Sequence, residues 1–137
     1  MEKVIPPIEE MRMIDYILLI VGAFIVAFWG IAHLFPTKGV VRNFGEISHD
    51  NKLIITMEWV VEGINLAFIG FLVTLVTIAA GADNAVSRLV YWSAAGLLVV
   101  MAVWHSLTGA RTKALPMKLC PFIFGTCAIL FVLGSLL

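Results

Sequence analysis

Four long apolar stretches, separated by short polar segments, account for most of the chain. They are residues 16–35, 53–80, 89–107 and 116–137. Each is close to or above the roughly 20 residues that a helix needs to cross the hydrocarbon core of a bilayer. Helices are expected because backbone polar groups in lipid must be satisfied within their own segment. The pattern therefore predicts an all-α fold, an integral membrane four-helix bundle, with residues 1–137 forming a single transmembrane domain.

Composition supports this prediction and excludes other classes of protein. Apolar residues make up 61% of the chain and charged residues 13%, with a mean hydropathy of +1.04. Soluble domains are about 45–50% apolar and about a quarter charged. The formal net charge of zero leaves no basic surplus for the phosphates of a nucleic acid. Two cysteines, Cys120 and Cys127, are too few for a disulfide scaffold, and we expect both to be reduced packing residues.

The charged residues also predict an orientation. Short connections make successive helices antiparallel, so both termini are expected on one side of the membrane. The other side, which we call the basic end of the bundle, carries the connections 36–52 and 108–115. Its six basic residues against three on the opposite side favour a cytoplasmic basic end, with both termini outside. The six are Lys38, Arg42, Lys52, Arg111, Lys113 and Lys118, and the three are Lys3, Arg12 and Arg88.

Polar residues inside the second apolar stretch give the strongest indication of a site. Glu58 and Glu62 are four residues apart and Asn65 follows three residues later, which places all three on one helix face. Glu62 is expected about 13 Å into the segment at the helical rise per residue. A carboxylate at depth costs at least about 2.5–3.5 kcal/mol, so it is seldom without a role. The alternatives are a neutral Glu62 bonded to a neighbouring helix, and an Asn65 that joins two helices.

Two histidines are expected in the same half of the membrane as these carboxyl groups. His33 and His105 end the first and third stretches, which both run towards the basic end, where the second stretch begins. Histidine is also common at helix ends for electrostatic reasons, and tryptophan is common at membrane interfaces. The candidate catalytic residues are Glu62, Glu58, His105 and His33, and the candidate ligand-binding residues are Asn65, Trp59, Trp29 and Trp104.

Three kinds of chemistry are compatible with this set. The favoured one, with no metal ion or cofactor, is binding or conversion of a lipophilic molecule by proton transfer, with a quinone-, sterol- or isoprenoid-like ligand. A metal ion held by two Glu and two His is less favoured, because the Glu-x-x-His pair of carboxylate-bridged bundles is absent. Haem between His33 and His105 is the third. A non-catalytic accessory subunit of a larger membrane complex is the rival from another class, and a homo-oligomer is a further expected partner.

Part of the first half resembles the DoxX-like group of small four-helix bacterial membrane proteins. The residues that carry the likeness are Gly30-Ile-Ala-His33-Leu-Phe-Pro36 and Glu62-Gly63-Ile-Asn-Leu-Ala-Phe-Ile-Gly70. The resemblance implies four helices and, for several members of that group, an association with quinone-linked or thiol redox systems. The chain has no Cys-x-x-Cys pair, and the stretch containing Cys120, Pro121 and Cys127 departs from the pattern of the group.

Overall fold

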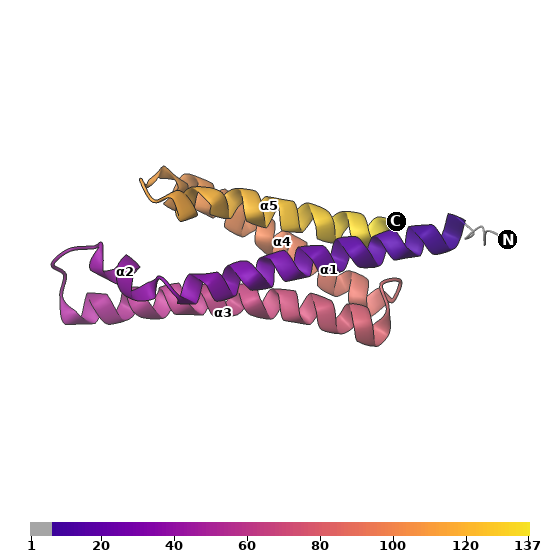
Figure 1. Cartoon of the computed structure of the whole chain (residues 1–137), viewed down its shortest axis with the longest axis horizontal. Coiled ribbons are helices and arrows are strands. Elements are labelled where there is room, and N and C mark those ends of the chain that lie inside the picture. Colours follow the sequence, from indigo (N-terminus) through magenta and orange to yellow (C-terminus); the bar gives the residue numbers. More distant parts are fainter. Residues whose placement is uncertain (1–6) are drawn as a thin grey trace.

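The computed structural model describes residues 7–137, and side chains from Arg12 onwards; these residues form helices and turns with no strand. Four long helices contain the four predicted stretches apart from the last residues of the first and fourth, Phe35 and Leu137, and each is long and apolar enough to cross a membrane. The elements, which Figure 1 shows in order, are α1 (Pro7–Leu34), α2 (Thr37–Arg42), α3 (His49–Ala80), α4 (Ala85–Leu107), the 3-10 turn η1 (Gly109–Arg111) and α5 (Leu115–Leu136).

The helix ends follow from local sequence. The side chain of Ser48 accepts a hydrogen bond from the Asn51 N–H at 3.2 Å and caps the start of α3. Asn84 caps α4 in the same way through the Val86 N–H at 2.8 Å. Gly81 ends α3 with a φ of 87°, a conformation that glycine adopts without steric cost. Residues 81–84 therefore join α3 and α4 by a tight turn.

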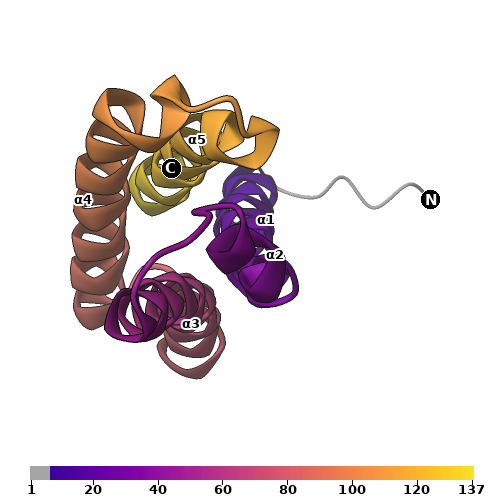
Figure 2. The ribbon, with the colours of Figure 1, turned by 90° about the vertical axis from the view of Figure 1, so that its left-hand side faces the viewer.

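The four long helices pack as two pairs that diverge at one end. α1 lies along α3 and also contacts α5, and α5 lies along α4, whereas α3 and α4 contact each other much less. Figure 1 shows the α1–α3 and α4–α5 pairs separating towards the end that carries α2 and η1, which is the basic end. Viewed from that end in Figure 2, α4 runs obliquely, from beside α5 at the basic end to α3 at the far end.

Glycine brings α1 and α3 into close contact. A Cβ atom on Gly30 would lie 2.5 Å from both the Ala67 nitrogen and the Gly63 oxygen, and one on Gly63 would lie 2.8 Å from the Gly30 oxygen. About two turns further along α3, a Cβ on Gly70 would meet the carbonyl oxygen of Ala23. Small residues at these positions let the two backbones approach each other, which is a common way for apolar helices to associate.

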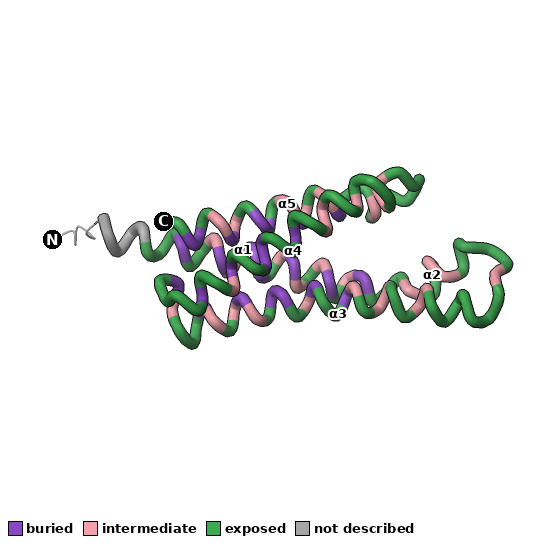
Figure 3. Tube along the Cα trace, turned by 180° about the vertical axis from the view of Figure 1, so that it is seen from behind, coloured by how far each residue is buried: buried purple, intermediate pink, exposed green. Residues whose placement is uncertain are grey.

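The buried residues lie along the inner faces of the long helices, as Figure 3 shows, while the basic end is mostly exposed or intermediate. The largest fully buried side chains come from all four long helices: Leu19, Leu66, Tyr91, Leu98, Phe124 and Phe131. The short helix α2 was not predicted by the apolar pattern, because six residues are too few to give a hydropathy signal.

Candidate functional site

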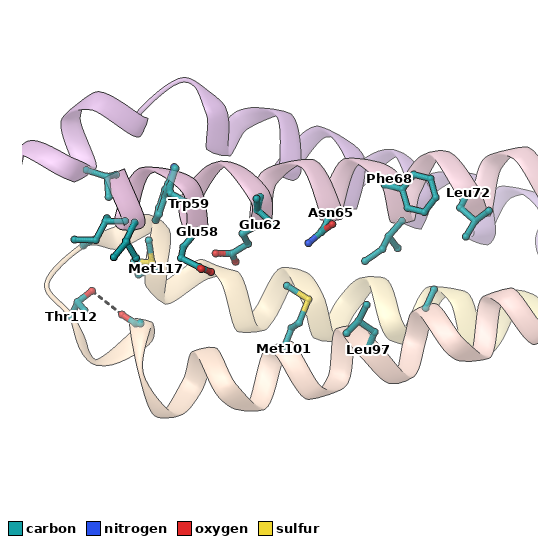
Figure 4. Close-up of a pocket in the computed structure, with 18 of the residues that line it drawn as sticks. Glu58, Trp59, Glu62, Asn65, Phe68, Leu72, Leu97, Met101, Thr112 and Met117 are labelled. Carbon is teal, nitrogen blue, oxygen red and sulfur yellow. Dashed lines mark hydrogen bonds between the residues drawn. The ribbon is translucent and has the colours of Figure 1, made fainter. Parts of the chain in front are cut away.

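A cleft of about 1420 Å³ lies between α3 and α4. Its walls are mainly apolar, and Figure 4 shows Phe68 and Leu72 of α3 facing Leu97 and Met101 of α4. At the basic end the cleft is bordered by residues in and directly after α2, and by the segment from η1 to the start of α5; these residues are Val40, Asn43, Phe44, Gly109, Thr112, Lys113, Ala114 and Met117.

Three polar side chains of α3 project into this cleft. Figure 4 shows Glu58, Glu62 and Asn65 on the face of α3 that is turned towards α4, as their spacing predicted. Glu58 and Asn65 are exposed residues whose side chains make no hydrogen bond to any residue of the described part of the chain. Neither of the two ion pairs found from Arg12 to Leu137 includes Glu58, so it forms no pair with Lys52. The cleft therefore contains polar groups that have no partner among the residues from Arg12 to Leu137.

Glu62 differs from these two because it contacts His105 of α4. The Glu62 Oε1 atom lies 3.0 Å from the His105 Nε2 atom, and the two side chains are only 23% and 14% exposed. The oxygen is off the direction of an aligned hydrogen bond, so the contact is a close electrostatic one. The rings of His105 and Phe124 meet edge-on with their centroids 5.1 Å apart, and the buried His105 Nδ1 atom has no hydrogen-bond partner among the described residues. His105 thus lies behind Glu62 rather than among the residues that line the cleft.

A second histidine lies behind Trp59, on α1. His33 is 6% exposed, and the rings of His33 and Trp59 have their centroids 5.1 Å apart. The Trp59 indole N–H donates to the His33 carbonyl oxygen at 2.6 Å, and the His33 Nδ1 atom lies 2.9 Å from the Trp29 carbonyl oxygen. Trp59 lines the cleft, whereas His33 and Trp29 do not. Trp104 is 65% exposed and does not line the cleft either.

Cys120 of α5 is a neighbour of the site that sequence reasoning treated only as a packing residue. The thiol is fully buried, donates to the Pro116 carbonyl oxygen at 3.4 Å and lies next to His33, His105 and the Trp29 indole. The sequence could have indicated this neighbourhood, because Cys120 lies at the basic end of the last apolar stretch, where the candidate His and Glu residues are also expected. Cys127 is also buried, and both cysteines are free, as expected.

The opposite end of the bundle contains a polar contact that the sequence did not predict. The Thr77 hydroxyl lies 2.8 Å from the Tyr91 hydroxyl, and the Ser87 hydroxyl donates to the Val76 carbonyl oxygen at 3.2 Å. Tyr91 is fully buried, and Asp15 is 4% exposed, with no hydrogen bond to its Oδ1 atom from the side chains and backbone that the structure describes. No spacing rule brings these residues together, because they belong to different helices. None of them borders the cleft.

The described part of the chain contains no group of three or more His, Cys, Asp or Glu side chains that could hold a metal ion. The comparisons with known proteins add no further identification: no family model, no curated protein and no solved structure matches the chain. The resemblance to the DoxX-like group therefore stays a prediction.

Proposed function

We propose that this chain is an integral membrane four-helix bundle whose cleft between α3 and α4 binds a lipophilic small molecule, and that Glu62 exchanges a proton with it. The observation that carries the proposal is the set of polar side chains in the cleft. Glu58 and Asn65 face an apolar space without a partner in the described residues. In hydrocarbon an unsatisfied polar group costs several kcal/mol, so a bound polar group or water is expected opposite them.

The expected orientation places both termini outside and the basic loops in the cytoplasm. Under this orientation Glu58, Glu62 and His105 belong to the cytoplasmic half of the membrane. The wide end of the cleft, beside Lys113, then faces the cytoplasm. The cleft is open to the lipid between α3 and α4, which would allow a quinone-, sterol- or isoprenoid-like molecule to enter sideways.

The pair of Glu62 and His105 suits proton transfer. Glu62 reaches the cleft, and the imidazole of His105 lies 3.0 Å behind it. When the carboxyl group gives its proton to an oxygen of the ligand, the carboxylate that remains is stabilised by the neighbouring imidazole. When the ligand loses a proton, the carboxylate accepts it. Glu58 lies one turn nearer the basic end and is exposed, so it can pass protons between Glu62 and water.

Analysis of molecules that co-purify with the chain in mild detergent tests the proposal. The wild-type protein is expected to retain a lipophilic molecule, found by mass spectrometry after extraction. Glu62→Gln, which removes the carboxyl proton site and keeps the shape, should lower its amount about tenfold, as loss of a hydrogen bond to a charged group implies. Glu46→Gln is the matched control, because Glu46 is exposed and does not border the cleft. Equal retention by all three proteins would contradict the proposal.

The second candidate is a non-catalytic accessory subunit, and the open side of the bundle between α3 and α4 favours it. In that case the same purification should recover a partner protein in stoichiometric amount instead of a small molecule. Glu62→Gln should then change only the stability of the chain.

A further inference from the structure

The polarity of the cleft changes along its length. On α3 its wall extends from Ile54 to Leu72, about 27 Å at the helical rise per residue. The carboxyl and amide groups lie in the part nearer the basic end. Beyond Asn65 the lining is apolar on both helices apart from the Ser93 hydroxyl: Phe68, Ile69, Leu72, Leu89, Val90, Ala94 and Leu97. A ligand that matches this gradient is long, with one polar end and one apolar end.

The shape of the gap between α3 and α4 favours a flexible hydrocarbon chain over a wider ligand. α3 and α4 are joined by residues 81–84, so they lie close together beyond Leu72 and separate towards the basic end. A helix with its side chains is about 10 Å across, too wide for the narrow part of such a gap. A rigid ring system of fixed width suits a gap that narrows along its length less well. A single hydrocarbon chain is narrower and flexible, so it suits such a gap better.

The polar groups specify the other end of the ligand. Glu58 and Glu62 are two acidic side chains four residues apart, and they disfavour an anionic head group between them by like-charge repulsion. A hydroxyl group is complementary, because it can donate to a carboxylate oxygen and accept from the amide of Asn65. An uncharged head of this kind also satisfies the two side chains that have no partner in the described part of the chain.

We infer that the ligand is a long single-chain alcohol that lies along the cleft, with its hydroxyl head among Glu58, Glu62 and Asn65 and its tail pointing to Leu72 and Leu89. This inference rests on the proposed function, since it identifies the class of the molecule that the same cleft binds. The hydroxyl group is the group that lies against Glu62, and it exchanges a proton with the carboxyl group in a concerted relay, giving one proton as it accepts another, so that it stays uncharged. Because lipid tails are as apolar as the cleft, the tail contributes little affinity and its position is the more informative observable.

Photolabelling of the full chain in phosphatidylcholine vesicles tests this arrangement. Two probes are made from oleyl alcohol, one with a diazirine at the end of the chain and one with the diazirine next to the hydroxyl carbon. Peptide mapping is expected to find the first probe at Leu72, Leu89 and Val90, and the second at Glu58 and Met117. Leu97→Trp fills the tail region and should lower chain-end labelling there about tenfold. Val100→Trp, on the exposed outer face of α4, is the matched control and should leave it unchanged.

The other outcomes separate the two proposals. A diazirine derivative of cholesterol that labels the cleft, with oleyl alcohol labelling only lipid-facing positions, would overturn the inference and keep the proposed function. Stronger labelling by an oleic acid probe would overturn the uncharged head in the same way. Labelling of the cleft residues by none of the four probes, together with equal lipid retention by wild type and Glu62→Gln, would overturn both. Reversed positions of the two alcohol probes would overturn the orientation.

Discussion

Helix α3 has two faces with opposite properties. On one face Gly63 and Gly70 lie so close to α1 that a single added carbon would meet backbone atoms. On the other, Glu58 and Asn65 project into open space between α3 and α4. The comparison shows how one helix can be held firmly and still border a cleft. Because contact with α1 fixes α3 in place, the fold does not need close packing between α3 and α4.

The largest effect is expected on the packed face. Gly30→Val places side-chain atoms against the backbone of α3, where Ala67 and Gly63 cannot move aside cheaply. The substitution should lower the free energy of unfolding by about 3 kcal/mol, at the upper end of overpacking costs. Unfolding of the purified protein in mixed micelles of increasing denaturing detergent measures it. Gly96→Val is the control, since a Cβ on Gly96 has no other atom within 4 Å, and it should change stability by less than about 0.5 kcal/mol. Equal losses in the two variants would refute the tight α1–α3 contact.

A smaller effect is expected for the contact between Glu62, on the cleft face of α3, and His105 of α4. Glu62 and His105 are mostly buried and 3.0 Å apart, so their interaction is stronger than that of a surface pair. A double-mutant cycle with Glu62→Gln and His105→Gln should give a coupling energy of about 1–2 kcal/mol in unfolding experiments. A coupling energy near zero would mean that the two side chains contribute independently, and that His105 does not support the charge on Glu62.

A substitution in the exposed part of the cleft face should weaken ligand binding and leave the free energy of unfolding nearly unchanged. Asn65→Ala removes an amide that has no partner in the described residues, so the free energy of unfolding should change by less than about 0.5 kcal/mol. Retention of the co-purifying molecule should fall about fivefold, the effect of one lost hydrogen bond. Mass spectrometry of extracts and detergent unfolding on the same preparations separate the two quantities. A loss of stability with full retention would instead assign Asn65 a structural role.

Much of this arrangement follows from the chain itself. Apolar length predicted the four long helices, and helical spacing predicted that Glu58, Glu62 and Asn65 share a face. Antiparallel connections predicted that His33 and His105 lie at the same end as Glu62. These predictions depend on helical spacing and on the alternating direction of successive helices, and both can be derived from a single sequence.

The open side of the bundle could not be predicted in this way. Glycines occur in all four long helices, and only packing shows that Gly30, Gly63 and Gly70 form a contact while Gly96 and Gly125 face open space. For the same reason the sequence did not reveal which histidine contacts which side chain. His105 reaches Glu62, His33 is covered by Trp59, and both lie beside Cys120 because of how α5 is placed against α1 and α4.

The smallest effect is expected at the other ion pair, which lies at the opposite end of the bundle. The Arg12 guanidinium contacts a carboxylate oxygen of Asp83 at 2.6 Å, but the two side chains are 65% and 63% exposed. Water and salt screen such a pair, and holding two mobile side chains in one geometry opposes the attraction. Arg12→Ala should therefore leave detergent unfolding unchanged within error and should not alter ligand retention. A clear loss of stability that disappears in high salt would show that this exposed pair, and not only the packing of α1 on α3, holds α1 to the turn between α3 and α4.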